Sequence, residues 1–590
     1  MIDLVGLLPA LLPVPYLMVT LLALASRNGR NAWLYIAGIV AGICTLTLSI
    51  IVWPATPLQD AWRWFSAGPL DVSWIVLRDP LALTLAALVG GIGALVFLYS
   101  GGYFGKGEDL RRYYALLALF ASSMVAAVTA GDLIQLLFAW EIIGVTSFLL
   151  IGFWHHRDAA VRAARKAFLT IIVGDAALLA GILALAIRYG TTGIPAILEA
   201  ARPDAITILA GVGILIGAIS KSAQFPLHDW LPDAMEGPTP VSAFLHSAAM
   251  VKAGLFLVAR MLPLLLLVGL GPWIALIALV TMLLASGIAL VETDIKRVLA
   301  YSTMNHIAIV LLALGLGAGA AALTHLLMHS VTKAMLFFSA GVLIHSAGTQ
   351  DLSRMRFQWR SLPVVSAIIG ALALAGIAPL AAAVSKDVVL EAAIEAGDPA
   401  LLLAFASALV LGAAYLVRWI LLITTPGGER MTAVADRRMT LPLPLLLVGA
   451  AAGALALPLL HALGVTTELR LGASALLSMA LAVVGGLLAY AATRTIALDW
   501  LSRSALASAA RARFLMDDLC AAVADGVAGL ARVWVAVDDA GVNRTARGIG
   551  NAAVLAGSKL RYTVTGRVRA YALAILIGAL ALILLVRWSP

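Results

Sequence analysis

The feature that most constrains the fold is a series of long apolar runs that recurs along the whole 590-residue sequence. A helix of about 20 apolar residues crosses the roughly 30 Å hydrocarbon core of a bilayer. Lipid offers the backbone no hydrogen-bond partners, so segments of this kind form helices. About sixteen runs have this length, namely residues 4–25, 32–53, 79–100, 112–130, 133–153, 166–187, 206–225, 240–262, 271–291, 295–316, 321–345, 363–384, 400–423, 440–462, 473–494 and 568–587. The sequence therefore predicts an all-α polytopic membrane protein.

Composition and charge narrow the class of protein further. Charged residues make up 12% of the chain and hydrophobic residues 62%, whereas a soluble domain carries about 25% charged residues. The net charge of +9 is spread over short loops, so it does not form the clustered basic stripe typical of nucleic-acid binding. Cys44 and Cys520 are the only cysteines, which leaves no disulfide framework and no thiolate metal site. We expect the lipid bilayer, and no nucleic acid, among the partners.

Positive charge sorts the loops between the predicted spans. Loops after odd-numbered spans carry clusters such as Arg157, Arg162 and Arg165, whereas loops after even-numbered spans carry few such residues. Because loops rich in Lys and Arg stay in the cytoplasm, we predict a multi-pass protein of the cell inner (plasma) membrane with both termini outside. The first run has no basic stretch before it and no convincing cleavage site, so we expect a retained span.

Residues 495–567 interrupt the apolar pattern. They are charged, with apolar positions such as Leu519, Val523 and Leu530 at helical spacing. This pattern predicts an amphipathic helix that lies along the membrane surface or a partner protein, followed by one closing span. A small cytoplasmic helical domain is the alternative.

Residues 219–260 place Lys221 and His246 in otherwise apolar runs. Ionisable groups at membrane depth are costly, and they usually face a bundle interior and mark an ion path. Four prolines interrupt the helices here: Pro226, Pro232, Pro238 and Pro240. A second combination, Pro379 followed by Lys386, occurs later in the chain. Paired discontinuous helices are typical of inverted-repeat transporters with ion sites near the middle of the membrane.

Glu141 lies in the middle of the run 133–153. A buried carboxylate stays charged only beside a cation, and Lys221 is the candidate. A lysine that gains and loses such a partner becomes a switchable proton site; a static buried ion pair is the alternative.

His325, His329 and Lys333 are spaced by four residues. Each step turns about 40° around a helix, so the three side chains line one stripe. We favour a hydrated relay of groups that titrate near neutrality. A metal site is the alternative, although no carboxylate or thiolate follows at ligand spacing.

Lys296 starts one apolar run, and Lys386 with Asp387 lies near the end of another. Lysines at span ends also extend toward the interface without further function. The chain contains no dinucleotide fingerprint, P-loop or iron–sulfur cysteine run. We therefore expect no cofactor in this chain.

The run KSAQ-x-P-x3-WLPDAM-x-GPTPVSA-x2-H, residues 221–246, strongly resembles the largest antiporter-like membrane subunit of proton-pumping NADH:quinone oxidoreductase, respiratory complex I. The same family includes subunits of multisubunit cation/proton antiporters. The resemblance implies two inverted repeats with broken helices, a long lateral helix along the adjacent antiporter-like subunit and a final anchor helix. It implies NADH, FMN, iron–sulfur clusters and quinone in partner subunits, and it places Asp175 at a subunit contact. It assigns proton translocation to Glu141, Lys221, His246, Lys296, His325, His329, Lys333, Lys386 and Asp387.

The resemblance also predicts how the chain is divided. We expect N-terminal helices at 1–110, half-channels at 111–263 and 264–425, additional helices at 426–494, the lateral helix at 495–567 and the anchor at 568–590.

The chain departs from the family pattern at three places. Ile172 replaces a usual arginine, Lys252 stands where complex I subunits often have threonine, and Asn305–His306 replaces the commoner Ser–Gln. Lys252 resembles the cation antiporter subunit. A cation/proton antiporter, membrane hydrogenase or inorganic-carbon-uptake subunit is therefore an alternative, and so is a mainly structural membrane subunit.

Overall fold

The structure is a computed structural model that describes residues 8–26, 33–54, 58–67, 70–105, 108–424, 435–451, 472–494, 508–509, 516–561 and 566–588. It divides into two units, residues 1–514 and 515–590. The second half of the predicted span 440–462 and much of the start of the predicted lateral helix lie outside the described residues.

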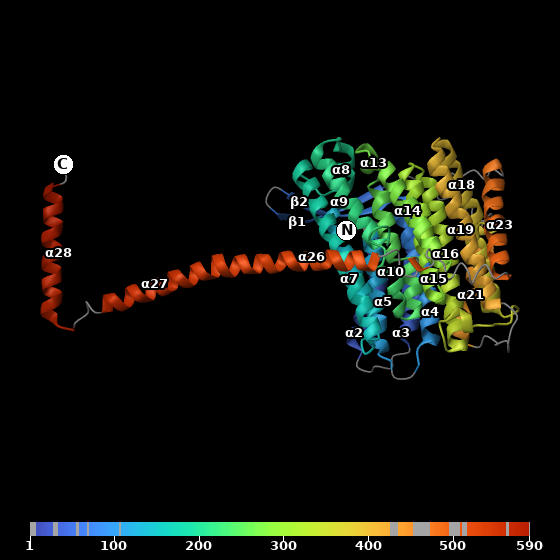
Figure 1. Cartoon of the computed structure of the whole chain (residues 1–590), viewed down its shortest axis with the longest axis horizontal. Coiled ribbons are helices and arrows are strands. Elements are labelled where there is room, and N and C mark those ends of the chain that lie inside the picture. The colour runs from blue at the N-terminus through green and yellow to red at the C-terminus, as the bar shows by residue number, and fades with distance from the viewer. Residues whose placement is uncertain are drawn as a thin grey trace, which may run out of the picture. The chain divides into compact units, whose positions relative to one another are not determined.

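The first unit is a bundle of helices (Figure 1). In chain order they are η1 (Leu8–Leu11), α2 (Val14–Ala25), α3 (Leu34–Ile51), α4 (Pro80–Tyr103), α5 (Leu110–Val128), α6 (Leu133–Ile151), α7 (Asp158–Tyr189), α8 (Ile194–Ala200), α9 (Ala205–Lys221), α10 (Trp230–Asp233), η2 (Ala234–Glu236), α11 (Thr239–Ser247), α12 (Met250–Arg260), α13 (Leu262–Leu267), α14 (Gly271–Ala289), α15 (Ile295–Gly315), α16 (Gly319–Ala347), η3 (Leu352–Arg354), α17 (Leu362–Ala375), α18 (Ala381–Glu395), α19 (Pro399–Thr424), α20 (Arg437–Thr440), α21 (Pro442–Ala451) and α23 (Ala473–Arg494).

Within the described residues, 12 helices are long and apolar enough to cross a membrane. Each coincides with one of the predicted spans, which confirms a polytopic helical membrane protein. Helix α5 is a further buried helix, and α9 and α17 are shorter apolar helices. Helix α21 is the described part of the predicted span 440–462. The total of sixteen spans stays a prediction.

Aspartates begin several of these helices. Asp79, Asp132, Asp204 and Asp294 each accept a hydrogen bond from a backbone N–H in the first turn, at α4, α6, α9 and α15. The first N–H groups of a helix have no partner within it, so a side-chain acceptor at this position stabilises the start. These caps explain why the apolar runs begin as helices where they do.

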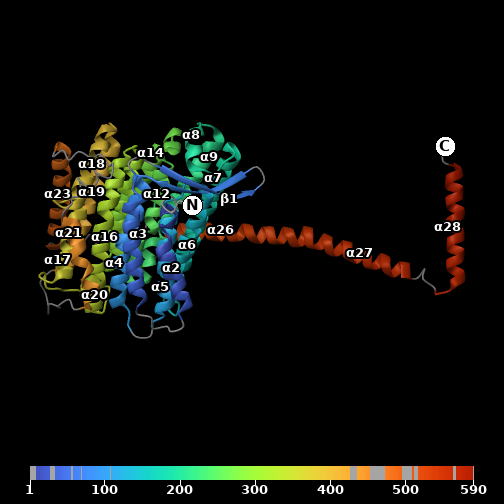
Figure 2. The same ribbon diagram turned by 180° about the vertical axis from the view of Figure 1, so that it is seen from behind.

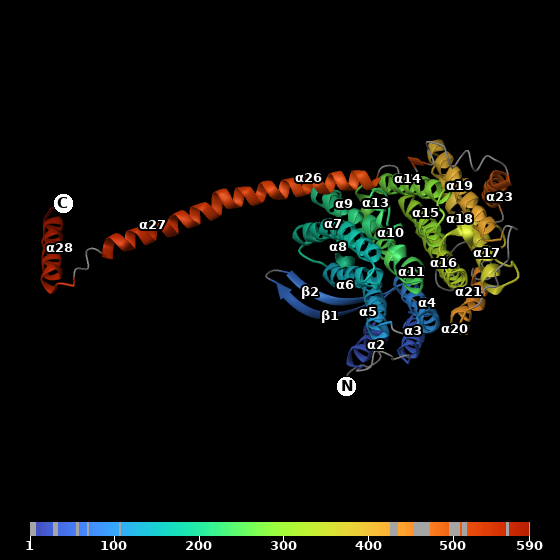
Figure 3. The ribbon, with the colours of Figure 1, turned by 60° about the horizontal axis from the view of Figure 1, so that its bottom comes forward.

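The helices that carry the ionisable residues lie in the core. The membrane-spanning window of α11–α12 is 100% buried and that of α15 is 94% buried, against 33% for α2 and for α3. Helices α2, α3 and α5 cover one face (Figure 2). Helices α7 and α9 lie at one side of the bundle and α19 and α23 at the other, with α14, α15 and α16 between them (Figure 3). A path from α9 to α18 therefore crosses the centre of the bundle.

Helices are broken at both places where proline and lysine occur together. Helix α9 ends at Lys221, and the chain continues through α10 and η2 before α11 starts at Thr239. Helix α17 ends before Gly376, which has a φ of +98°, and α18 starts at Ala381. A left-handed backbone of this kind favours glycine, because a Cβ atom there clashes with the backbone. The expected broken helices are therefore present in both halves.

The segment between the second and third predicted spans forms a β-hairpin, which the sequence analysis did not predict. Strands β1 (Leu58–Ala67) and β2 (Leu70–Arg78) pair antiparallel, with Trp62 opposite Trp74. Gly131 and Leu77 donate hydrogen bonds that join β2 to the turn between α5 and α6. Aromatic residues at cross-strand positions stabilise such hairpins. The hairpin extends beyond the helices on the α7–α9 side (Figure 1, Figure 3).

The second unit contains α26 (Met516–Val537), the π-helical turn η6 (Asp538–Asn543), α27 (Arg544–Arg561) and α28 (Val568–Trp588). The first three form one continuous helix over residues 516–561. At 1.5 Å per residue it is about 70 Å long, more than twice the thickness of a hydrocarbon core. Helix α28 is apolar and long enough to span a membrane.

Candidate functional site

Lys221 is buried at the C-terminal end of α9. Its ammonium donates a hydrogen bond to the backbone oxygen of Trp140 at 2.7 Å and lies 4.1 Å from the centroid of the Trp140 ring. Asp175 Oδ1 lies 3.9 Å from Lys221 Nζ and accepts a hydrogen bond from the Trp140 indole at 2.6 Å. The end of a helix attracts a cation, and the indole face adds a cation–π interaction. Lys221 is thus a buried charge with several compensating groups.

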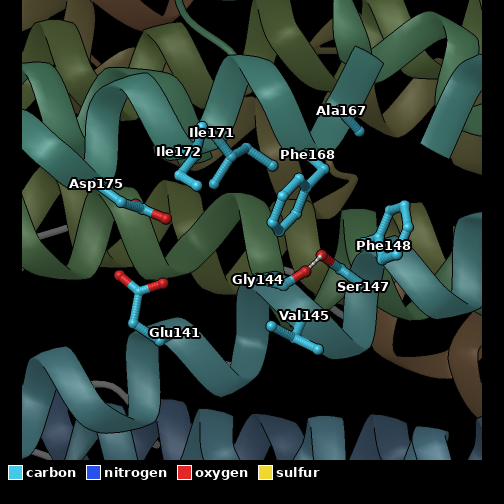
Figure 4. A pocket seen from close by; sticks show the side chains of 10 residues that line it. All are labelled: Glu141, Gly144, Val145, Ser147, Phe148, Ala167, Phe168, Ile171, Ile172 and Asp175. Carbon is cyan, nitrogen blue, oxygen red and sulfur yellow. Dashed lines mark hydrogen bonds between the residues drawn. The ribbon is translucent and has the colours of Figure 1, made fainter. Parts of the chain in front are cut away.

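Glu141 follows Trp140 in α6 and is exposed on the surface of the bundle. In the chain by itself Glu141 lies on the outer face of α6, whereas Trp140 faces inward. Glu141 and Asp175 line one small surface pocket with Gly144, Phe148 and Ile172. Figure 4 shows the carboxylates of Glu141 and Asp175 pointing toward one another across it. Asp175 is therefore the carboxylate at ion-pair distance from Lys221.

Lys296 lies in the first turn of α15 and is buried. It donates hydrogen bonds to the backbone oxygens of Met235 at 2.5 Å and Gly237 at 2.7 Å. These carbonyls belong to the broken segment between α9 and α11. Irregular backbone at membrane depth needs such partners, so Lys296 stabilises the break while it brings a titratable group to it.

Lys333 and His246 are also fully buried, on α16 and α11. Lys333 donates a hydrogen bond to the backbone oxygen of Leu299 at 3.0 Å. His246 packs against the Phe337 ring at 4.7 Å, and neither of its ring nitrogens has a partner among the described residues. His246 experiences electrostatic repulsion from three lysines, Lys333, Lys296 and Lys252. Because like charges repel strongly in a low-dielectric interior, a proton on any of these lysines raises the cost of a proton on His246.

A row of side chains continues from α12 to α18. Lys252 Nζ lies 3.3 Å from His329 Nδ1 and donates a hydrogen bond to Ser330 at 2.7 Å. The His329 ring stacks on that of His306, which lies 3.2 Å from His325 (Nδ1 to Nε2). His325 Nδ1 in turn lies 2.9 Å from the hydroxyl of Ser385. His325, His329 and Lys333 are thus all buried on the predicted helix, and the two histidines join a larger polar row.

Lys386 follows Ser385 and is also buried. It donates a hydrogen bond to the backbone oxygen of Ala375 at 3.3 Å, and its aliphatic chain packs over Gly376. The positive charge of Lys386 acts electrostatically on His306 and His325. Asp387 points elsewhere: it is 9% exposed and hydrogen-bonds to Ser474 of α23.

The acidic residues between α9 and α11 make ion pairs with neighbouring helices. Lys166 lies 3.0 Å from Asp233, and Arg297 lies 3.7 Å from the same carboxylate. Arg157 lies 3.8 Å from Glu236. These partly exposed pairs tie the broken segment to α7 and α15, which supports a structural role for this loop.

Sequence reasoning missed Trp140 beside Lys221 and three members of the polar row. Trp140 gave no signal, because an aromatic residue in an apolar run resembles a core residue. Lys252 and His306 did give one, as departures from the family pattern, yet no functional role was assigned to either. Ser385 has no distinguishing feature before the helices are packed. Among the described residues, no group of three or more His, Cys, Asp or Glu side chains is arranged to hold a metal ion.

The fold and the site define a class of protein. A bundle of membrane-spanning helices that buries titratable side chains from α9 to α18 is built to translocate ions, since such residues are otherwise avoided at membrane depth.

Two family models match the chain. One describes the transmembrane part of NADH:quinone oxidoreductase and Mrp antiporters and covers residues 130–412. The other describes the N-terminus of chain 5 of NADH-ubiquinone oxidoreductase (complex I) and covers residues 64–114. The chain belongs to this family of antiporter-like membrane subunits.

Individual relatives agree with the family. The chain is 37% identical to NADH-quinone oxidoreductase subunit L of Mycobacterium tuberculosis over 556 residues, covering 88% of this chain and 87% of the relative. It is 39% identical to the chloroplastic NAD(P)H-quinone oxidoreductase subunit 5 of Capsella bursa-pastoris over 407 residues. That match covers 64% of this chain and spans about half, 55%, of the chloroplast relative.

Solved structures share the fold. The Mrp complex of Dietzia sp. contains a chain with a TM-score of 0.72 and 28% identity, covering 99% of this chain and 63% of that one. The archaeal membrane-bound sulfane sulfur reductase contains one with a TM-score of 0.68 and 20% identity, covering 81% of this chain and 98% of that one. The latter likeness concerns the fold alone.

Proposed function

We propose that this chain is the proton-translocating subunit of a complex I-type NADH:quinone oxidoreductase in the bacterial inner membrane. The observation that carries the proposal is the set of buried lysines and histidines in the interior of the bundle, from Lys221 at the end of α9 to Lys386 in α18. Its relatives named above are subunits of such oxidoreductases. NADH, FMN, iron–sulfur clusters and quinone belong to partner subunits, since the chain has no motif for them.

The first half-channel, residues 111–263, receives and holds the proton. Lys221 is the switchable carrier, and Asp175 and Glu141 set the charge around it. When a carboxylate beside Lys221 is protonated or moves away, the cost of the buried ammonium rises and its proton is passed on. His246, Lys296 and Lys333 receive it, and a positive charge on either lysine opposes a proton on His246.

The second half-channel, residues 264–425, delivers the proton. His329 and His325 relay it to Lys386, and Asp387 forms the exit. Each proton that moves against a membrane potential costs about 2.3 kcal/mol per 100 mV. The redox partners supply that free energy through electrostatic and conformational coupling.

The surface around Glu141 supports contact with another membrane subunit. Glu141 is exposed within a 19-residue apolar helix, and a carboxylate that faces lipid at membrane depth is costly. A polar surface of an adjacent antiporter-like subunit that covers Glu141 and Asp175 removes this cost. The long helix of residues 516–561 serves as the lateral helix along such neighbours, and α28 serves as its anchor. Both termini of the chain lie on the outer side of the membrane.

Replacement of the carriers tests the proposal. We expect Lys221→Ala and Lys386→Ala to lower NADH-driven proton uptake into inverted membrane vesicles by about tenfold or more, with the complex still assembled. Arg360→Ala, which removes an exposed cation from the loop before α17, is the control and should leave uptake unchanged. Normal pumping in both carrier variants would show that the ion path lies elsewhere.

A cation/proton antiporter is the second candidate, and one observation favours it. Lys252, which resembles the antiporter subunit, is buried and bonded within the polar row, and the Mrp chain shares the fold. A proton flux that is driven by a sodium gradient without NADH would support this candidate.

A further inference from the structure

His306 occupies the middle of the polar row. It is fully buried in α15, while its neighbours in the row, His325 and His329, belong to α16. His306 Nδ1 lies 3.2 Å from His325 Nε2, with the two rings stacked at 5.4 Å. On its other side its ring stacks on His329 at 5.5 Å. His325 and His329 are one helical turn apart, and His306 bridges them from the facing helix.

Two nitrogens at this junction have no protein partner. Nε2 of His306 and Nε2 of His329 are both buried and unpaired among the described residues. A buried polar group without a hydrogen bond costs about 1–3 kcal/mol. Two hydrogen bonds of about 2.9 Å let one water molecule bridge two atoms up to about 5.8 Å apart, and the rings that carry these nitrogens have centroids 5.5 Å apart. The two orphan nitrogens are therefore suited to share one water molecule.

We propose that His306 is a further proton carrier that passes protons between His329 and His325. This inference rests on the proposed function. An N–H bond forms at the His306 nitrogen that faces the donor, and the N–H bond at its other nitrogen breaks as the acceptor takes that proton. The ring keeps its charge and exchanges tautomers, and a rotation of the ring restores the starting form. No oxidant or other reactant is needed.

The neighbouring groups give the row a direction. Lys252 contacts His329 at one end, and Ser385 contacts His325 at the other, next to Lys386. Without His306, the described contacts stop at His329 on one side and at His325 on the other. Asn305, the adjacent residue, turns away and donates hydrogen bonds to Ser286 and to the backbone of Met282 in α14. The row therefore depends on His306 and not on its neighbour.

The test compares two replacements of His306 in the assembled complex. His306→Gln keeps the approximate size and the hydrogen bonds but carries no exchangeable ring proton, and His306→Met removes both. We expect NADH-driven proton uptake in inverted vesicles to fall about tenfold in His306→Met and by severalfold in His306→Gln. Asn305→Ser, the matched control, should stay within about twofold of the parent. Assembly is checked by the amount of complex in the membrane.

Two results separate this inference from the proposed function. Uptake at the parent rate in His306→Gln, with uptake lost in Lys221→Ala, would overturn the role of His306 alone. Parent uptake in His306→Gln, Lys221→Ala and Lys386→Ala alike would overturn the proposed function as well. If His306→Met does not assemble, His306→Gln alone decides between carrier and hydrogen-bonding residue.

Discussion

Lys221 and Lys386, the two lysines near the helix breaks, are equally buried but have different surroundings. Lys221 has a carbonyl, an indole face and a carboxylate around its ammonium. Lys386 has the carbonyl of Ala375 and no carboxylate within ion-pair distance among the described residues. A compensated buried charge is tolerated, whereas an uncompensated one is costly. The break after α9 therefore stabilises the positive charge of Lys221, whereas the break before α18 stabilises that of Lys386 only weakly.

The largest expected effect tests the carboxylate that distinguishes the two sites. Asp175→Ala leaves Lys221 without its ion-pair partner and the Trp140 indole without its acceptor. We expect a loss of about 3–5 kcal/mol in the free energy of unfolding. Asp387→Ala, beside Lys386, should cost about 1 kcal/mol, since it removes one hydrogen bond and no ion pair. Thermal unfolding in detergent measures both, and equal losses would erase the difference between the sites.

The next effect concerns the glycine that lies beside each lysine. A Cβ atom on Gly376 would meet Lys386 Cδ at 3.3 Å, and its backbone has a φ of +98°. A Cβ atom on Gly144 would meet Lys221 Nζ at 3.8 Å, an ordinary contact in a helix. We expect Gly376→Ala to destabilise the protein by about 1–2 kcal/mol and to impair proton uptake. Gly144→Ala should be neutral or slightly stabilising. A larger loss of stability in Gly144→Ala than in Gly376→Ala, measured in the same unfolding assay, would contradict this expectation.

A smaller effect tests the link between Lys386 and the histidines. Ser385→Ala removes the hydroxyl 2.9 Å from His325 and should cost about 1 kcal/mol with a severalfold loss of uptake. Ser147→Ala is the matched control, because this buried serine bonds to the backbone of Gly144 within its own helix. Uptake that is equal in the two variants would show that Ser385 does not take part in the row.

The smallest effect lies at the start of α9. Asp204 accepts hydrogen bonds from the Thr207 N–H and from Arg188, which lower its pKa to about 2. Leu380, at the start of α18, gives no such cap. Because the folded pKa lies below the unfolded value of about 3.9, the stabilisation is complete above that value and is lost as pH falls through about 2. Asp204→Ala should lower the unfolding midpoint at neutral pH, less than Gly376→Ala does, and the difference from the parent should shrink in acid. A constant difference would contradict this account.

Much of the fold follows from local patterns. Three features act over only a few residues: the apolar runs, the aspartate caps and the prolines near Lys221 and Lys386. Their effects can therefore be predicted from the sequence. The hairpin of residues 58–78 was missed because its short alternating strands lie between two strong apolar runs. Its pairing partner, the turn near Gly131, becomes adjacent only in the folded bundle.

The candidate site was predictable in kind but not in its pairings. Buried lysines and histidines were named from their position in apolar runs, and the structure places Lys221, His246, Lys296, His325, His329, Lys333 and Lys386 in the interior. The partner of Lys221 was assigned as Glu141, whereas Asp175 lies at ion-pair distance. His306 was noted as an unusual residue without a role.

The sequence by itself determined that this protein is a bundle of membrane helices with costly ionisable groups in its core. That conclusion rests on the free-energy cost of placing polar groups in lipid, which can be judged for each segment separately. Only the tertiary structure decided which groups meet. Trp140 and Lys221 are 81 residues apart in the chain. A helix that is turned about its axis by the angle of one residue presents a different side chain to its neighbour. The packing of α6, α7 and α9 therefore turns Glu141 outward and Asp175 inward, and the packing of α15 on α16 places His306 between two histidines.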